Sequence, residues 1–377
     1  MVFIICERLQ PLNNLAKEMK VRQREMRSKN PLAPEITIFD VAEKAGVSHS
    51  TVSRVINNKS NVNAQTRERV LHAMEQLGYV GNMHARSLAG GSSHVIGLLV
   101  DHLNTGYTDE LIKGIDEALE THSYNLMLYT THRQKTREAA YVAKMTQGLA
   151  DGLILIVPRN EKAYLETLQQ RKFPYVLIDY QGYNRHVPSI ITTNRKGGND
   201  ATTYLISLGH RRIGFITGEM AYGCAPERLA GYRAALEDHD IAFDPELVRE
   251  GNFLQPQGYQ CAHQLLSLPQ PPTALVVSND VMAFGAMEAA RELGFRIPTD
   301  LSIIGFDDIP QAAHVHPPLS TVRQPLEEMG RSAVNLLFKY IANPQAEIER
   351  VELSTRLIIR ESCQPLPISS RGNTTYG

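Results

Sequence analysis

Between residues 37 and 57, apolar residues recur at helical spacing in two short segments on either side of Gly46. Thr37 and Ser48 each precede one segment and are suited to cap a helix, with Asp40 three residues after Thr37. A glycine between them favours a sharp turn, so the stretch predicts a helix-turn-helix. Its predicted inward residues are Val41, Ala42, Ala45, Val52, Val55 and Ile56.

A third amphipathic stretch follows at residues 63–78, with Asn63 as its expected cap and Gly78 at its end. Two short helices alone cannot bury a core, so this third helix is expected to close a small bundle. The residues expected to face that core are Val70, Leu71, Met74 and Leu77.

From residue 94 onward, apolar runs of strand length alternate with amphipathic stretches of helix length. This alternation is typical of parallel sheets built from βαβ units. Seven strands over roughly 270 residues fit two doubly wound lobes better than one, so a small all-α domain and a two-lobed α/β core are predicted. The expected strands are Val95–Val100, Asn125–Tyr129, Gly152–Val157, Tyr175–Asp179, Ile213–Thr217, Ala274–Ser278 and Ser302–Phe306, and the expected helices include Asp109–His122, Arg228–Glu237 and Met282–Leu293.

Changes in composition divide the chain into five segments. Residues 35–80 are predicted to form the helix-turn-helix domain and 94–362 the two-lobed core. The stretch 81–93 begins with a helical pattern and ends in glycine and serine, which indicates a short helix and a linker at a domain boundary. Residues 1–34 are expected to be a disordered extension or an over-long start, and 363–377 a disordered tail.

Composition is ordinary for a water-soluble protein, with 42% hydrophobic and 21% charged residues among 377. The net charge of −1 conceals an asymmetry, because residues 1–89 carry 13 Lys and Arg against 8 Asp and Glu, and the remainder carries 26 against 32. A basic head favours a polyanionic partner. Four scattered cysteines show no metal or redox spacing, so a reducing compartment such as the cytoplasm is expected.

Polar residues follow several of the predicted strands. Ligands bind outside the carboxyl ends of strands in open parallel sheets, which makes these residues candidate ligand contacts. The chain contains no nucleophile elbow, zinc-binding His-Glu-x-x-His, phosphate loop or dinucleotide fingerprint, so we expect no enzymatic activity and neither a metal nor another cofactor. The strand-end residues are Asp101, Asp179, Asn279, Asp280, Asp307 and Asp308.

From about Thr37 to Arg360, the chain resembles the lactose/galactose repressor family of bacterial transcription regulators. The resemblance implies a periplasmic-binding-protein-like pair of lobes that holds a small effector in its cleft. The sequence departs from the usual pattern at Thr193, where many relatives have Asp, and at Pro226. The matching motifs are Asp40-Val-Ala-x-x-Ala-Gly-Val-Ser-x-x-Thr-Val-Ser-Arg-Val-x-Asn57, Leu77-Gly-Tyr with Asn82-x-x-Ala-Arg-Ser-Leu88, Leu208-Gly-His-Arg-Arg-Ile-Gly214, Arg228-Leu-Ala-Gly-Tyr232, and Asn279-Asp280 followed by Gly305-Phe-Asp-Asp308.

By this resemblance, the second helix enters the major groove of a pseudo-palindromic operator in double-stranded DNA. His49, Ser50 and Arg54 lie on its outward face and are expected to contact base edges. The forked guanidinium of Arg54 suits O6 and N7 of a guanine. Phosphate contacts, which fix the register without reading sequence, are expected from Thr37, Thr51, Ser53, Asn57 and Asn61.

The resemblance also implies that the hinge segment orders on DNA, with Asn82, Ala85 and Leu88 contributing to binding. Leu88 would wedge into the minor groove and kink the duplex, and the small Ala85 would let two hinge helices approach each other. Ordering of this segment would couple the effector cleft to DNA binding.

The effector site follows from the same resemblance, residue by residue. Carboxylates, amides and an arginine around one cleft suit a polyhydroxylated ligand such as a carbohydrate, since each hydroxyl both donates and accepts. The ligand's identity and the direction of control stay open. The expected contacts are Asp101, Asn104, Tyr107, Asp179, Arg228, Asn279 and Asp307.

The function predicted is a ligand-responsive, sequence-specific DNA-binding repressor that acts as a homodimer, because a two-part operator calls for two readers. The alternative is a solute-binding module without a DNA role. That alternative explains the two-lobed core but does not explain the presence of residues 37–89.

Overall fold

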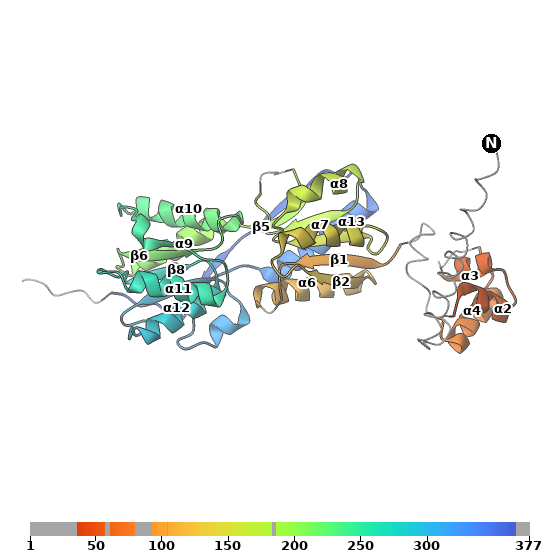
Figure 1. Ribbon diagram of the computed structural model, residues 1–377, viewed down its shortest axis with the longest axis horizontal. Helices are drawn as coiled ribbons and strands as arrows, with labels where there is room; N and C mark the ends of the chain where they lie inside the picture. The colour runs from red at the N-terminus through yellow and green to blue at the C-terminus, as the bar shows by residue number, and fades with distance from the viewer. Residues whose placement is uncertain (1–35, 57–60, 80–91, 104, 183–185, 367–377) are drawn as a thin grey trace, which may run out of the picture. The chain divides into compact units, whose positions relative to one another are not determined.

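The computed structural model describes residues 36–56, 61–79, 92–103, 105–182 and 186–366 (Figure 1). The chain divides into two compact units, residues 1–91 and 92–377, which are described separately below.

The N-terminal unit contains three helices, α2 (Ile38–Ala45), α3 (His49–Ile56) and α4 (Ala64–Leu77). The Asp40 carboxylate accepts hydrogen bonds of 2.7 Å from both the backbone N–H and the hydroxyl of Thr37, which fixes the start of α2. Gly46 ends α2 in the left-handed region at φ 64°, a conformation that costs glycine little. The Ser48 hydroxyl accepts the Thr51 N–H at 3.2 Å and so caps α3 as predicted.

The core of this unit confirms most of the predicted inward residues. One expectation was wrong, because the Leu71 side chain is 51% exposed and Ala73 is buried in its place. Within the described part of this unit, helix α4 packs against two short helices, so its buried stripe is narrow and Leu71 lies outside it. The buried residues are Val41, Ala42, Ala45, Val52, Val55, Val70 and Ala73, and Ile56, Met74 and Leu77 pack against them partly buried.

The larger unit contains two six-stranded sheets. The first has the order β11-β5-β4-β3-β1-β2 and is parallel throughout. The second has the order β12-β10-β9-β8-β6-β7 and is parallel except for the antiparallel edge strand β12. The strands are β1 (Val95–Val100), β2 (Asn125–Thr130), β3 (Gly152–Ile156), β4 (Tyr175–Ile178), β5 (Ser189–Thr192), β6 (Ile213–Thr217), β7 (Val248–Glu250), β8 (Ala274–Val277), β9 (Ser302–Asp307), β10 (Ser320–Arg323), β11 (Arg350–Leu353) and β12 (Arg356–Ile358).

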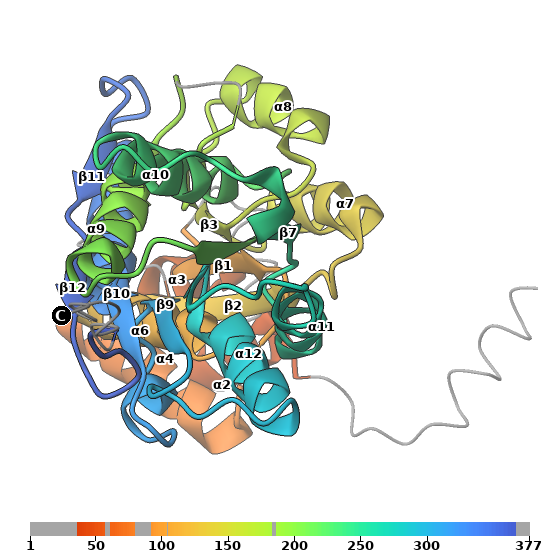
Figure 2. The same ribbon diagram turned by 90° about the vertical axis from the view of Figure 1, so that its left-hand side faces the viewer.

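Helices cover both faces of each sheet, which is why the central strands are apolar on both sides (Figures 1 and 2). In the first lobe, α6 (Tyr107–Thr121) and α13 (Leu326–Ala342) cover one face, and α7 (Lys135–Met145) and α8 (Leu165–Gln170) cover the other. In the second lobe, α9 (Asn194–Ser207) and α10 (Cys224–Glu237) pack opposite α11 (Gln255–Leu266) and α12 (Asp280–Glu292).

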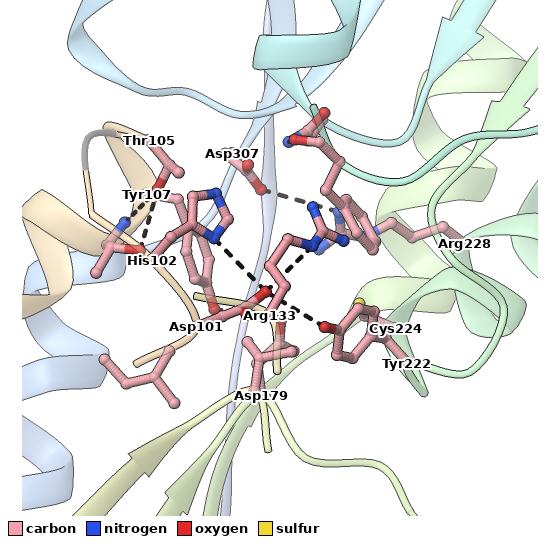
Figure 3. Close-up of a pocket in the computed structure, with 15 residues that line it drawn as sticks. Asp101, His102, Thr105, Tyr107, Arg133, Asp179, Tyr222, Cys224, Arg228 and Asp307 are labelled. Atoms are coloured by element: carbon pink, nitrogen blue, oxygen red, sulfur yellow. Dashed lines mark hydrogen bonds and ion pairs between the residues drawn. The ribbon is translucent and has the colours of Figure 1, made fainter. Parts of the chain in front are cut away.

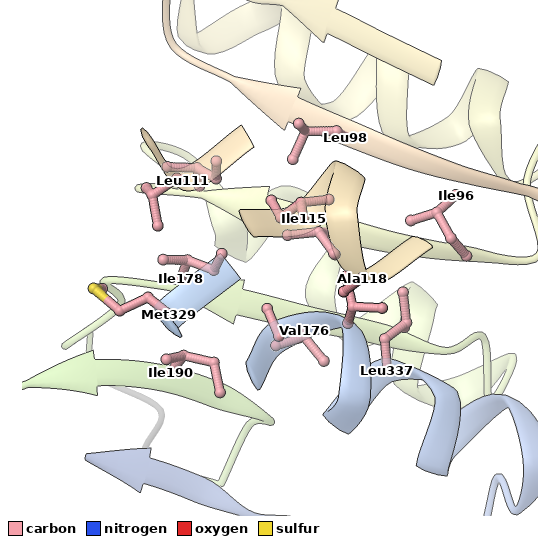
Figure 4. Packing of buried hydrophobic residues seen from close by; sticks show 14 of the residues in the cluster. Ile96, Leu98, Leu111, Ile115, Ala118, Val176, Ile178, Ile190, Met329 and Leu337 are labelled. Atoms are coloured by element: carbon pink, nitrogen blue, oxygen red, sulfur yellow. The ribbon is translucent and has the colours of Figure 1, made fainter. Parts of the chain in front are cut away.

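The core of the first lobe is drawn in Figure 4. Leu111 and Ile115 of α6 and Leu337 of α13 pack onto β1 and β4, and all three side chains are fully buried. The two helices approach closely at Gly114, where a Cβ atom would lie 2.1 Å from the Glu327 carbonyl oxygen. Because α13 follows the second sheet in sequence yet packs in the first lobe, the chain crosses between the lobes three times.

All seven predicted strands are present, and their observed ends differ from the predicted ones by at most one residue. Five further strands, β5, β7, β10, β11 and β12, have three or four residues each and were not predicted. Helix α10 begins at Cys224, four residues before the predicted start, because Pro226 lies in its first turn, where no backbone N–H is needed. Within the described ranges, no helix is long and apolar enough to span a membrane.

Candidate functional site

A cleft opens between the two lobes, where the carboxyl ends of strands from both sheets meet (Figure 3). Its cavity encloses about 640 Å³ of space, a figure that includes the solvent at its open mouth. Asn104 is outside the described residues. The other six residues predicted to contact an effector all line the cleft: Asp101, Tyr107, Asp179, Arg228, Asn279 and Asp307.

Arg228 projects from the first turns of α10 into the floor of the cleft, and its side chain is 3% exposed. Its Nε donates a 2.7 Å hydrogen bond to Oδ1 of Asn194, and its guanidinium lies 3.7 Å from the ring centre of Phe306. A further nitrogen lies 3.9 Å from the carboxylate of Asp307. The guanidinium is therefore held in one orientation before any ligand contact.

Asp179, which follows β4, and Tyr107, which begins α6, approach each other in the first lobe. The Tyr107 hydroxyl donates to Asp179 Oδ2 at 3.3 Å, and Asn194 Nδ2 donates to Asp179 Oδ1 at 3.5 Å. Burial raises the pKa of Tyr107 well above its ordinary value, and the nearby Asp179 and Asp307 charges add to the shift. Tyr107 therefore stays a neutral hydroxyl that can donate and accept hydrogen bonds.

Asp307 lies at the end of β9 and is 3% exposed. Gln324 Nε2 donates to its Oδ1 at 2.8 Å. Burial nevertheless raises the pKa of Asp307 to about 7, although Arg228 and Gln324 oppose the shift. Its carboxyl group is therefore partly protonated at neutral pH.

Several residues of the cleft have a left-handed backbone, which is costly for residues other than glycine. Val157 is the clearest case, since a β-branched residue at φ 46° is strained. Such strain clusters at sites where side chains must point in directions that a regular strand cannot supply. The lining residues concerned are Arg133, Val157, Asp179, Phe253 and Asp307.

Asn279 lines the cleft and also caps α12. Its Oδ1 accepts the Met282 N–H at 2.9 Å, and its Nδ2 donates to the Phe253 carbonyl at 3.1 Å. The structural role of a strand-end cap and the proposed role in ligand contact therefore coexist in this residue. Thr193, where the chain departs from the family pattern, bonds to Thr355, and the adjacent Asn194 bonds to Arg228.

Two other strand-end acids have structural partners instead. The Asp280 carboxylate accepts the Ile309 N–H at 2.9 Å and the Thr321 hydroxyl at 2.5 Å inside the second lobe. Asp308 pairs with Arg323 and Arg360. Neither lines the cleft.

Sequence reasoning missed several residues that line the cleft or border it. It selected acidic and amide residues after strands, although the same positional rule also picks out Arg133 after β2, Arg159 after β3 and Glu219 after β6. Tyr222 of the second lobe was also missed, and its hydroxyl donates to Asp101 of the first lobe at 3.4 Å. The missed lining residues include His102, Thr105, Arg133, Tyr222, Cys224 and Phe253.

In the helical unit, the residues expected to contact bases share one face of α3. His49, Ser50 and Arg54 are exposed, and Thr51 and Ser53 are half-buried. An exposed aromatic residue that the sequence reasoning did not select, Phe39, lies beside them with its ring centre 5.4 Å from that of His49.

The remaining residues expected at the DNA are only partly described. Thr37 is exposed and its hydroxyl is bonded to Asp40, and Asn61 is exposed. The predictions for Asn57, Asn82, Ala85 and Leu88 fall outside the described residues.

Family models match two parts of the chain. Residues 37–82 match the bacterial regulatory proteins of the lacI family, and residues 202–363 match a periplasmic binding protein-like domain. The first match covers the helix-turn-helix, and the second covers most of the second lobe.

Individual relatives extend over nearly the whole chain. The HTH-type transcriptional repressor PurR of Histophilus somni is 35% identical over 331 residues, which cover 88% of this chain and 99% of the relative. The lac repressor dimer, solved with operator and the anti-inducer ONPF, superposes with a TM-score of 0.77 at 30% identity and covers 88% of this chain and 100% of that one. The transcriptional regulator CelR in complex with cellobiose gives 0.67 at 32% identity, over 87% and 99%.

These similarities confirm the predicted fold class and do not favour a solute-binding module without a DNA role, because the matched region includes the helix-turn-helix. The chain belongs to the lacI family of bacterial regulatory proteins and is a ligand-responsive, DNA-binding transcription repressor.

Proposed function

We propose that this repressor binds a sugar-like, polyhydroxylated effector in the cleft between its lobes and that this effector controls its affinity for a pseudo-palindromic operator. The observation that carries the proposal is the convergence of six predicted residues from both sheets on one cavity. Carboxylate, amide, hydroxyl and guanidinium groups in that cavity can satisfy a ligand that donates and accepts at each hydroxyl. The CelR relative holds cellobiose, which supports the same ligand class.

The cleft joins both lobes, so a ligand that contacts both sides changes the equilibrium between their arrangements. Tyr222 and Arg228 belong to the second lobe, whereas Asp101 and Tyr107 belong to the first. A ligand that bridges these residues binds one arrangement of the lobes more tightly than another. That difference in affinity is the free energy available to change the affinity for DNA.

On the DNA side, His49, Ser50 and Arg54 contact base edges in the major groove. Their exposure on one face of α3 supports this assignment. The assigned phosphate contacts are Thr37, Thr51, Ser53, Asn57 and Asn61, and the assigned hinge contacts in the minor groove are Asn82, Ala85 and Leu88.

The active form is proposed to be a cytoplasmic homodimer, because each helix-turn-helix reads one half of a two-part site. The lac repressor relative was solved as a dimer on operator, which supports this assembly.

The test is selection of bound sequences from random duplex DNA by the purified full-length protein at moderate salt. Enrichment of one pseudo-palindrome is expected, followed by a change in affinity for that site when a sugar from a screened panel is added. Failure to enrich any sequence would contradict the DNA-binding part. A site whose affinity responds to no sugar in the panel would contradict the effector part.

A further inference from the structure

Four charged residues join the two lobes at the cleft, and we refer to them as the cleft ion cluster: Asp101, Arg133, Arg159 and Glu219. The two arginines follow β2 and β3 of the first lobe, and Glu219 follows β6 of the second. Arg159 Nη2 lies 2.5 Å from both carboxylate oxygens of Glu219, and Arg133 Nη2 lies 3.1 Å from Oε2. Glu219 therefore engages the Nη2 nitrogen of both guanidinium groups.

The rest of the cluster uses the remaining arginine donors. Arg133 Nη1 and Nη2 donate to the Asn252 carbonyl oxygen of the second lobe, each at 3.1 Å. Both arginines also lie 3.7 Å from Oδ2 of Asp101. The guanidinium of Arg159 is 5.0 Å from the ring centre of Tyr222, and its side chain is 9% exposed. Two arginines that alone would attract an anion are thus engaged by groups of the protein.

Charges in and beside the cleft are close to balanced. Within the described part of the chain, three guanidinium groups face four carboxyl groups there, and the Asp307 carboxyl is partly protonated at neutral pH. A ligand with a carboxylate or phosphate would add negative charge to a partly buried site that already carries a slight excess of it. The groups are Arg133, Arg159, Arg228, Asp101, Asp179, Asp307 and Glu219.

We propose, resting on the effector role proposed above, that the cleft selects a neutral polyhydroxylated ligand and that Glu219 is the residue that excludes ligands bearing a carboxylate or phosphate. An anionic group that takes up the Nη2 donors of Arg133 and Arg159 must displace Glu219, which pulls apart the contact between the lobes. A neutral sugar leaves that contact in place and hydrogen-bonds to Asp101 and Arg228, which line the cleft.

Calorimetric titration of the full-length protein with matched pairs tests this assignment. The pairs are glucose against glucuronate and glucose 6-phosphate, galactose against galacturonate, and ribose against ribose 5-phosphate. Wild type is expected to bind the neutral member of at least one pair tenfold or more tightly than its charged counterparts. In Glu219→Gln, which removes the carboxylate that pairs with two guanidinium groups and keeps the side-chain size, this preference is expected to shrink or invert. Tighter binding of a charged member by wild type would overturn the assignment.

A second measurement decides the role of Glu219 even if no sugar binds. Inorganic phosphate is titrated into wild type and Glu219→Gln while the thermal unfolding midpoint is followed. We expect phosphate to raise the midpoint of the variant and to leave wild type unchanged, and equal responses would overturn the assignment. If no sugar binds but phosphate raises the unfolding midpoint of Glu219→Gln and not of wild type, the result contradicts the sugar effector and leaves the role of Glu219 supported.

Two further variants control these measurements. Glu246→Gln makes the same charge change at an exposed glutamate of the same lobe, and it is expected to behave as wild type toward phosphate and sugars. Glu219→Ser removes the carboxylate with a different side chain, so agreement with Glu219→Gln excludes an effect of the glutamine itself. Opposite behaviour of the two Glu219 variants toward phosphate would overturn the assignment.

Discussion

The hydroxyl of Thr192 donates a 2.6 Å hydrogen bond to Oε1 of Gln324, and both residues are buried. Thr192 ends β5 just before the first crossing between the lobes, and Gln324 lies in the second crossing, between β10 and α13. The amide nitrogen of Gln324 in turn donates to Asp307 in the effector cleft at 2.8 Å. One side chain thus links two crossing segments to the ligand site.

Gln324→Ala is expected to destabilise the core by about 1–3 kcal/mol, because it leaves a buried hydroxyl and a buried carboxyl without this partner. Urea unfolding of the full-length protein measures the change. Glu328→Ala, at an exposed position of α13, is the control and is expected to change the free energy of unfolding by less than about 0.5 kcal/mol. Equal effects of the two substitutions would show that the Gln324 bonds contribute nothing to stability.

The pKa of Asp307, raised by burial from 3.8 to about 7, predicts a pH-dependent stability. Between about pH 4 and pH 7, the Asp307 carboxyl group is protonated in the native protein and ionised in the unfolded chain. The stability contributed by Asp307 is therefore fully present below about pH 4 and is lost as the pH rises through 7. In Asp307→Asn this loss is absent, so wild type should lose stability relative to the variant between pH 5 and pH 7, by at most about 1.4 kcal/mol per pH unit.

Urea unfolding at pH 5, 6, 7 and 8 measures this difference. Asp300→Asn serves as the control, because hydrogen bonds from Arg296 lower the pKa of Asp300 to about 2 and it stays ionised over this range. Its offset from wild type should be constant with pH. Parallel curves for wild type and Asp307→Asn would contradict a raised pKa at Asp307.

Gly198 of α9 sets how closely α9 and α10 pack behind the cleft. A Cβ atom at this position would lie 2.3 Å from the backbone carbonyl oxygen of Arg228, so Gly198→Ala must push the helices apart. We expect a destabilisation of about 1–3 kcal/mol and weaker effector binding, because the bond between Arg228 and Asn194 is stretched.

Thermal unfolding and ligand titration of the same preparation separate the two effects of Gly198→Ala. Asp200→Ala breaks a surface ion pair with Lys196 on the same helix and should cost at most about 1 kcal/mol without a change in affinity. Unchanged stability in Gly198→Ala would mean that α9 shifts without cost.

Arg54→Ala is expected to relax the preference for the operator over altered half-sites by about 1–3 kcal/mol, since a forked contact to one base pair is lost. Competition binding with single-base variants of the selected site measures this preference. Arg69→Ala removes one exposed positive charge from α4 and should weaken binding to all DNA sequences alike. Loss of affinity without loss of preference in Arg54→Ala would place Arg54 on a phosphate.

The apolar pattern of the chain was sufficient to predict the helix-turn-helix and seven of the strands. Val41, Val52 and the strand Val95–Val100 are buried as expected, because these segments show their period or their length within the local sequence. Position after a strand likewise identified Asp101, Asp179 and Asp307, since parallel strands in one sheet end at the same edge.

Contacts between segments far apart in the chain could be found only in the tertiary structure. Glu219 faces Arg133 and Arg159 from another sheet, and no local pattern of the sequence encodes that pairing. Gln324 likewise appears ordinary in sequence yet connects a crossing segment to the cleft. The sequence by itself determined which residues form helices and strands and which strand ends bear polar groups, because these depend on neighbours along the chain. The tertiary structure decided which charges are already paired across the cleft, because that depends on how the two lobes meet.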